Sequence, residues 1–269
     1  MQNTTTSLLL DFERRAFSEH YAKYFEVKRN NFFATIQSFP DQWKCFMLLD
    51  DLLMREFEDL NHQHDPNVAL PLNLFMHAHA LFRIALEHAF SGSLNECWNI
   101  FRMSIESTYQ GCLILKKPEL ALTWRRKADR TKETRDDFNR AFRFNRAESF
   151  ELLGLERLHQ VWEWFSEWGH TNIDALSTRF EYELGPNRAE IQVHYFETKP
   201  ERLGLSIMHL LQATHELEKA LFFRFDDRLK LDFVLGSRRQ EFVNAAESAR
   251  IGLFRRFPEL IPSSPSAPS

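Results

Sequence analysis

Apolar residues recur along most of the chain with the three- and four-residue spacing of amphipathic helices. Glycine and proline are scarce, and long stretches without these breakers favour helices over many short strands. The clearest repeat follows Pro71 and places these residues on one helix face: Leu74, Phe75, Ala78, Leu81, Phe82, Ala85 and Ala89. The pattern predicts an all-α fold, a helical bundle of about seven to eight helices.

Helix starts and stops divide this bundle along the chain. Asp41 is placed to cap a helix that carries Phe46, Leu49, Leu52, Leu53 and Phe57 on one face, and residues 61–71 are expected to form a loop. The helix at about 94–115 is apolar over most of its circumference, so it should be the most buried. Further helices are predicted at about 8–38, 118–146, 149–168, 200–224 and 238–257.

The period changes to two between residues 178 and 197. Phe180, Tyr182 and Leu184 alternate with polar residues, as do Ile191, Val193 and Tyr195, and "GPNR" lies between the two runs. This pattern predicts a β-hairpin at about 178–197. No internal repeat or linker interrupts the body, so we expect one domain over 1–258 and a disordered Pro/Ser-rich tail over 259–269.

Composition narrows the class of protein. The chain has 269 residues, 43% of them hydrophobic, and a formal net charge of −4, which gives no long-range attraction to nucleic acid. Three widely spaced cysteines form no CxxC pair, and no apolar run is long enough for a membrane span. Dinucleotide, P-loop, esterase and HExxH signatures are missing. We expect a cytoplasmic protein without cofactor, metal or membrane.

The first candidate constellation is Arg102 and Glu106, one turn apart on the helix expected to be most buried. Asn99 shares their side of that helix. A buried charged pair is costly unless it is well hydrogen-bonded. It is therefore either a structural ion pair that orders neighbouring helices or the polar wall of a ligand site.

The second candidate is the stretch "SEWGHTN". Gly169 is a natural residue to end a helix, and Asn172 can cap the next one, so helix punctuation explains both. Punctuation explains Glu167 and His170 less well, and an imidazole suits general acid–base work. We take His170, Glu167, Arg102 and Glu106 as candidate catalytic residues.

Two further patterns allow alternative functions. Basic residues alternate with acidic ones and phenylalanines from Arg125 to Arg146, which fits either a solvated helix with ion pairs or a surface that tracks nucleic acid. Glu156/His159 and Glu167/His170 have the Glu-x-x-His spacing of helical di-iron sites. Both pairs lie on one predicted helix, whereas that site needs several helices.

Several motifs together resemble a family of uncharacterised bacterial helical proteins that is similar in outline to HEPN domains. They are Arg102-x-x-x-Glu106, the Pro118-led helix with Trp124-x-Arg126, and Gly169-His170-x-Asn172, within a resemblance that covers about 81–172. HEPN domains are helical bundles that often dimerise, and some are RNases with the motif Arg, four to six residues, His. No arginine precedes His170 at that spacing, although Arg83 and His88 meet it.

The resemblance and the candidate residues lead to one functional expectation. We expect a HEPN-like cytosolic stress or defence protein that binds RNA or a nucleotide-like anion in a polar pocket between helices, with RNase-like hydrolysis implied by the resemblance. The ligand-binding residues would be Arg126, Trp124, Asn172 and Asn99, with Arg102 holding the anion. The alternatives are a non-enzymatic homodimeric interaction module and a helical di-iron oxidase.

Overall fold

The computed structural model describes residues 17–60, 66–142, 147–169, 180–185, 188–193, 195–225 and 233–260. Its α-helices are α2 (Glu19–Ser38), α3 (Pro40–Leu60), α4 (Pro66–Phe90), α5 (Leu94–Lys116), α6 (Leu120–Arg126), α7 (Lys132–Ala141), α8 (Ala147–Glu151), α9 (Glu156–Gly169), α11 (Pro200–Phe225) and α12 (Phe233–Arg256). Short 3₁₀ helices follow α6 (η1, Lys127–Asp129) and α12 (η2, Pro258–Leu260). The all-α class is confirmed.

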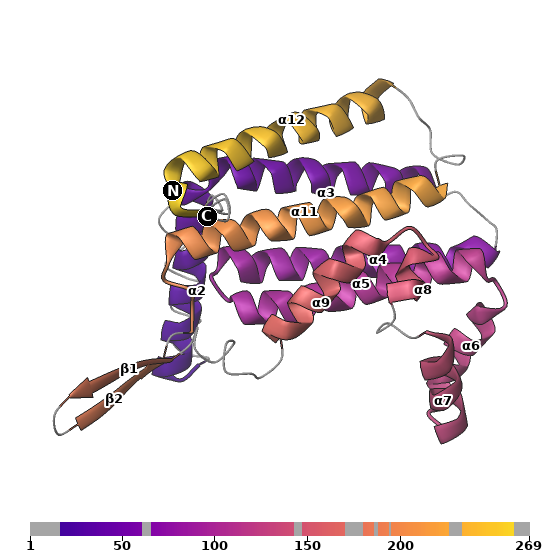
Figure 1. Ribbon diagram of the computed structural model, residues 1–269, viewed down its shortest axis with the longest axis horizontal. Coiled ribbons are helices and arrows are strands. Elements are labelled where there is room, and N and C mark those ends of the chain that lie inside the picture. The colour runs from indigo at the N-terminus through magenta and orange to yellow at the C-terminus, as the bar shows by residue number, and fades with distance from the viewer. Residues whose placement is uncertain are drawn as a thin grey trace, which may run out of the picture.

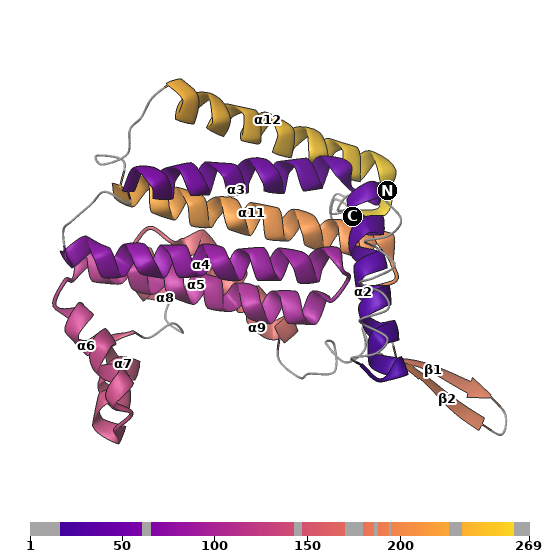
Figure 2. The ribbon, with the colours of Figure 1, turned by 180° about the vertical axis from the view of Figure 1, so that it is seen from behind.

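The long helices α3, α4, α5, α11 and α12 lie side by side and form the bundle (Figure 1). α12 covers α3, and α11 packs against α3, α4, α5 and α9 from the centre of the stack. α2 crosses one end of the bundle, whereas α6 and α7 extend from the opposite end, as the reverse view shows (Figure 2). The bundle therefore has two distinct ends.

The predicted apolar faces point into one core. Every residue of the α4 repeat is buried, and so are the five apolar residues predicted for α3. α5 begins at Leu94 and buries about half of its residues, as α4 does, so α5 is a central helix but is not, as had been expected, the most buried one. Cys45, Cys97 and Cys112 are free and buried. Core burial at 3.6-residue periodicity is the dominant stabilising term of this fold.

The predicted number of helices was wrong, because the residues that the structure describes contain ten α-helices. The single helix expected over 118–146 is broken at Arg130, which adopts a left-handed conformation, and Thr131 then caps α7 by accepting from the Thr134 N–H at 3.1 Å. The helix expected over 149–168 is broken at Gly154, whose φ is +64°. Each break replaces one expected helix with two shorter ones.

The start of α4 also differs from the prediction. Residues 61–71 were expected to form a loop, but α4 begins at Pro66 and Pro71 lies inside it. Pro66 takes the first helical position, where a missing N–H costs no hydrogen bond. By length and composition, Val68–Phe90 is also apolar enough to cross a bilayer, with 56% of its most apolar window buried inside the bundle. The core helix of a globular bundle meets the same criterion.

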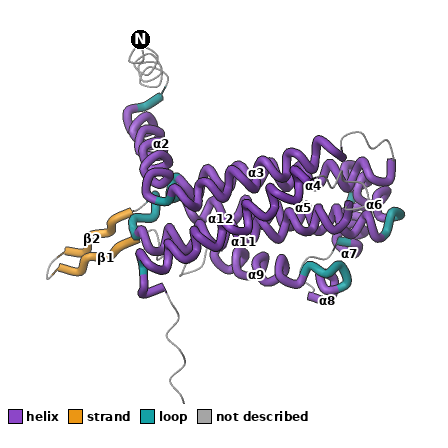
Figure 3. The backbone as a smooth tube through the Cα atoms, turned by 90° about the horizontal axis from the view of Figure 1, so that it is seen from above, coloured by secondary structure: helices purple, strands orange, loops and turns teal. Residues whose placement is uncertain are grey.

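Two short strands project from the end of the bundle where α2 lies (Figure 3). β1 (Phe180–Gly185) and β2 (Arg188–Val193) pair antiparallel, with Tyr182 opposite Ile191. They precede α11, and the segment between β2 and α11 leads back to the bundle. The tail after Leu260 lies outside the described residues.

Candidate ligand pocket

Arg102 and Glu106 join two helices. The Arg102 Nε lies 3.5 Å from Glu106 Oε1, and each side chain is about a quarter exposed (27% and 25%). Trp162 on α9 donates its indole N–H to the same Glu106 oxygen at 3.1 Å. The pair thus ties α5 to α9, which supports its interpretation as a structural ion pair.

The other predicted ligand residues do not meet at one point of the described structure. Trp124 on α6 donates its indole N–H to Gln110 at 2.6 Å, and Arg126 on the same helix is exposed to solvent. Asn99 is exposed and donates to the Asn95 carbonyl at 3.1 Å. Trp124 and Arg126 therefore belong to the α6–α7 end of the molecule.

Part of the predicted catalytic set falls outside the described residues. Glu167 is exposed near the end of α9, and Gly169 ends that helix as expected. His170 and Asn172 lie in the range 170–179, which the structure does not describe. The catalytic role of His170 stays a prediction.

The Arg83/His88 pair and the Glu-x-x-His spacings can be placed as well. Arg83 makes two hydrogen bonds to Asp50, at 2.7 and 2.8 Å, so its guanidinium is already engaged. His159 lies 3.6 Å from Glu163 on its own helix. Among the residues that the structure describes, no three His, Cys, Asp or Glu side chains converge as a metal site would require. The di-iron alternative has no ligand set in that part of the chain.

A pocket does form at the opposite end of α5, and it starts from the turn between α4 and α5. Gly92 has a φ of +82°, which side chains other than glycine rarely adopt. Its carbonyl accepts a hydrogen bond from the backbone N–H of Glu197 at 2.8 Å, and a Cβ at this position would lie 3.3 Å from that nitrogen. Glycine at position 92 therefore lets the segment before α11 dock onto the turn.

Glu197 then organises the start of α11. Its Oε1 accepts from the backbone N–H groups of Thr198 and Lys199, at 3.1 and 3.0 Å, and its side chain is 8% exposed. Its other oxygen lies 3.7 Å from Nε of Arg202, one turn into the helix. The carboxylate is thus held in place beside the guanidinium, which it contacts as an ion pair without a hydrogen bond.

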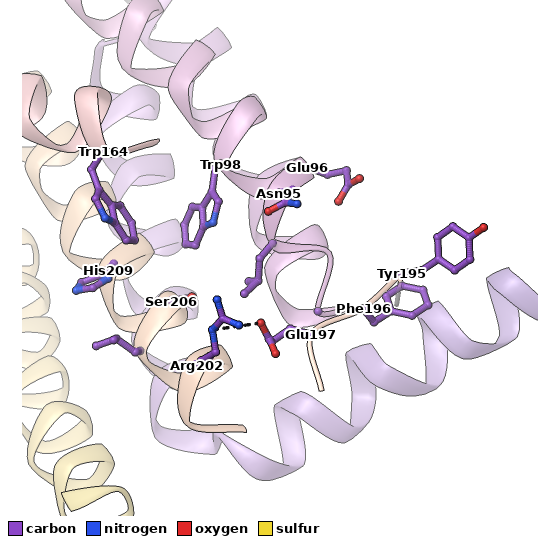
Figure 4. A pocket seen from close by; sticks show the side chains of 13 residues that line it. Asn95, Glu96, Trp98, Trp164, Tyr195, Phe196, Glu197, Arg202, Ser206 and His209 are labelled. Atoms are coloured by element: carbon purple, nitrogen blue, oxygen red, sulfur yellow. Dashed lines mark ion pairs between the residues drawn. The ribbon is translucent and has the colours of Figure 1, made fainter. Parts of the chain in front are cut away.

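The pocket lies above Arg202, between the beginning of α5, α9 and α11 (Figure 4). It has a volume of about 130 Å³ and is lined by Gly92, Leu94, Asn95, Glu96, Trp98, Trp164, Tyr195, Phe196, Glu197, Arg202, Leu205, Ser206 and His209. The rings of Trp98 and Trp164 are 5.4 Å apart and inclined at 59°, so they form a corner rather than a stack. We call this cavity the Trp98–Trp164 pocket.

The polar groups of the pocket are few and differ in character. Burial lowers the pKa of His209, which keeps the imidazole neutral at pH 7, and its Nδ1 has no hydrogen-bond partner among the described residues. The Arg202 guanidinium makes no hydrogen bond within the described part of the chain and points from Glu197 toward Trp98. Glu96 points away from both (Figure 4). The pocket thus offers aromatic walls, one cation that lies beside the Glu197 carboxylate, and one neutral imidazole.

The sequence held a weak signal for this pocket. Glu197 precedes Pro200 and "ETKPER" is typical of a helix start, so a carboxylate cap with an arginine one turn later was readable locally. Nothing local connects that segment with Trp98 or Trp164, because the three come from separate helices. The pocket depends on the tertiary fold.

A second group of charges was not expected from the sequence. Glu56 on α3 and Glu218 on α11 are both fully buried, and Arg239 on α12 lies 3.1 Å from Glu218 and 3.8 Å from Glu56. Burial, together with the neighbouring Glu218, raises the pKa of Glu56 to about 10. Burial raises the pKa of Glu218 as well, against the pull of Arg239. The sequence signal for this buried group is that Glu56 and Glu218 each interrupt the apolar face of a helix.

No protein-family model, curated protein or solved structure matches the chain. The fold and the pocket together define an all-α bundle with a small aromatic pocket at one end.

Proposed function

We propose that the protein binds a small anionic ligand that carries one planar ring, with the ring in the Trp98–Trp164 pocket and the anionic group on Arg202. The observation that carries this proposal is the Arg202 guanidinium, which lines the pocket beside Glu197 while its N–H groups make no hydrogen bond within the described structure. This is the anion-binding role expected of Arg102, assigned to a different arginine.

The size and the walls of the pocket support a single ring. A dry cavity of about 150 Å³ lined by apolar side chains accommodates benzene in a well-studied lysozyme variant, and the pocket here is of similar volume, about 130 Å³. Tryptophan faces stack on planar rings, and each such contact contributes about 1–3 kcal/mol. A larger fused ligand would need the walls to move.

The polar lining supports an anion on the ring. Arginine presents a planar fork that matches carboxylate and phosphate oxygens in pairs. Glu197 already accepts two backbone hydrogen bonds and lies on the Nε side of Arg202, so the remaining N–H groups are the ones a ligand can reach. A neutral His209 can donate to or accept from a ring nitrogen or oxygen. A pyrimidine nucleotide and an aromatic carboxylate share this chemistry.

The proposed ligand class includes the nucleotide expected from the sequence. The other expectations stay predictions. HEPN-like membership, a role in stress or defence, dimerisation, cytoplasmic localisation and RNase-like hydrolysis rest on the sequence alone. No catalytic residue is proposed in the Trp98–Trp164 pocket.

Calorimetric titration with benzoate, uridine monophosphate and their uncharged counterparts benzamide and uridine tests the proposal. Arg202→Met keeps the length of the side chain and removes the fork, and we expect it to weaken binding of the charged probe about tenfold to a hundredfold. Binding of the uncharged probe should change little. Benzoate and uridine monophosphate distinguish a carboxylate from a phosphate ligand.

Two controls make the result specific. Arg157→Met removes the same charge from an exposed position at the start of α9, and it should leave binding unchanged. Trp164→Leu should weaken charged and uncharged probes alike, because it removes a ring wall. The proposal is wrong if no probe binds, or if Arg157→Met weakens binding as much as Arg202→Met does.

A further inference from the structure

The opposite end of α5 carries a small helical extension with its own apolar anchor. α6, η1 and α7 (Leu120–Ala141, here the α6–α7 arm) project from the bundle (Figure 1). Trp124 fixes the arm to α5 through Gln110, and Phe138 stacks on Phe142 with both rings buried, 4.8 Å apart. The arm is therefore a folded element with one buried side.

The exposed side of the arm is basic. Between Arg125 and Arg140 the sequence holds seven lysines and arginines against four acidic residues, although the whole chain carries a net charge of −4. The cations are exposed: Arg125, Arg126, Lys127, Arg130, Lys132, Arg135 and Arg140. In this part of the described structure only Arg140 has a carboxylate partner, Asp137 at 3.7 Å. The remaining arm cations face solvent without a counter-charge at contact distance.

The turn of the arm contains an arginine where the backbone favours glycine or asparagine. Arg130 has a φ of +57°, the one positive φ at a non-glycine residue in the described ranges. The left-handed region costs an ordinary side chain on the order of 1 kcal/mol, and such outliers concentrate at functional sites. Arg130 thus places a guanidinium in this turn at a local cost in stability.

We propose that the α6–α7 arm binds the phosphate backbone of a nucleic acid, with Arg130 at the centre of the contact. Five of its seven cations are arginines, whose forks match phosphate oxygens. Lys127 covers the Phe138 ring at 3.9 Å, so this ring is not open to a base, and the contact reads charge rather than sequence. α7 itself carries three cations and three carboxylates, so the surplus positive charge lies before it, on the stretch from Arg125 to Arg130, where four cations face one carboxylate.

Other acidic partners fit the arm less well. An amphipathic helix that inserts into a membrane surface carries several apolar side chains beside its cations. Leu122 is the only large apolar side chain exposed on this fully described arm. An acidic peptide lacks the regular spacing of tetrahedral phosphates. Binding to a membrane surface or to an acidic peptide is therefore tested alongside binding to the oligonucleotide.

Fluorescence anisotropy with a labelled oligouridylate tests the proposal in the full chain. Binding should weaken with salt, and log Kd should change with log salt by about 0.7 for each phosphate contacted. Arg130→Gly relieves the backbone strain, so the melting temperature should stay the same or rise. The same variant should bind the oligonucleotide several-fold more weakly and reduce the salt slope by about 0.7.

Matched variants distinguish the effect of the arm on oligonucleotide binding from the effects of net charge and of the Trp98–Trp164 pocket. Arg130→Lys keeps the charge and should retain most of the binding, whereas Arg157→Gln removes one charge elsewhere and should retain all of it. Arg202→Met should leave oligonucleotide binding unchanged, so the arm can be refuted while the pocket stands. Equal binding of a polyglutamate peptide or of anionic vesicles, or equal weakening by Arg157→Gln and Arg130→Gly, would overturn the proposal.

Discussion

Replacing Glu56 by glutamine tests whether the buried carboxyl pair holds a proton. Glu56 has no exposed surface, and its pKa in the folded protein is about 10, against an ordinary value of 4.5. Between these values the folded chain carries a proton that the unfolded chain has released. The free energy of unfolding must therefore fall as pH rises, by about 1.4 kcal/mol per pH unit for one proton.

The sign and the size of the effect follow from this window. The protonated Glu56 contributes its full stability below pH 4.5, and that contribution is lost as pH rises toward 10. Glutamine has no proton to lose, yet its amide can still donate to Glu218 while Arg239 keeps its partner. Glu56→Gln should match the parent chain near pH 5 and exceed its unfolding free energy by up to about 4 kcal/mol near pH 8.

Urea unfolding followed by circular dichroism between pH 5 and pH 8 measures this difference. Glu58→Gln is the matched control, because it makes the same substitution at an exposed position of α3. It should leave the pH dependence of the unfolding free energy unchanged. A Glu56→Gln variant that is destabilised by the same amount at every pH would refute the reasoning, since it would show an ionised Glu56 in the native state.

Two other predictions concern packing and acid stability. Gly204→Ala places a methyl group 2.6 Å from Leu253 Cδ1 and 2.7 Å from Phe39, both buried, and should cost about 1–3 kcal/mol in thermal unfolding. Gly236→Ala, with open space around it on α12, should instead gain up to about 1 kcal/mol; equal effects would contradict the close packing of α11 against α12. Burial alone would raise the pKa of Asp50, but hydrogen bonds from His79 and Arg83 outweigh it and hold that pKa well below its usual range. Asp50→Asn should therefore lose about 2 kcal/mol at neutral pH, and the gap to the parent should close as pH falls below about 4; a gap that persists in acid would count against the ionised Asp50.

The sequence predicted the apolar faces well because helix burial repeats locally. α4 shows this: each of its seven expected core residues is buried, and the five apolar residues expected on one face of α3 are buried too. The breaks were less readable. An arginine in a left-handed turn carries no local signal, so the break at Arg130 between η1 and α7 was missed.

The site was harder to predict because its parts come from distant segments. Trp98, Trp164 and Arg202 lie on three helices that only the tertiary fold brings together. Arg102 and Glu106 looked functional because charges on a buried helix are rare. In the structure Trp162 donates a hydrogen bond to Glu106, so the pair joins α5 to α9 and its presence on a buried helix is explained by stability. A charge pattern alone does not separate a helix-joining pair from a ligand site.

The positions of paired and unpaired charged side chains along the bundle indicate where a ligand-binding site can form in this fold. A charge between packed helices must find a partner or give up its ionisation, because an unpaired buried ion costs several kcal/mol. Asp50 with Arg83 and Glu218 with Arg239 follow that rule within the bundle. At the ends of the helices water solvates a guanidinium, so the guanidinium can stay charged there without a hydrogen-bond partner from the protein.

Arg202 lies at the start of α11 and Arg130 lies on the α6–α7 arm. The start of α11 and the arm are at opposite ends of the bundle (Figure 1). α5 has 23 residues, which separates the two ends by about 35 Å. That distance is several times the screening length of about 8 Å at physiological salt, so a ligand at one end does not act on the other through its charge. Any coupling between pocket and arm must then pass through α5 as a packed, rigid element. Binding of the ring-bearing anion and of the oligonucleotide should be additive unless α5 moves.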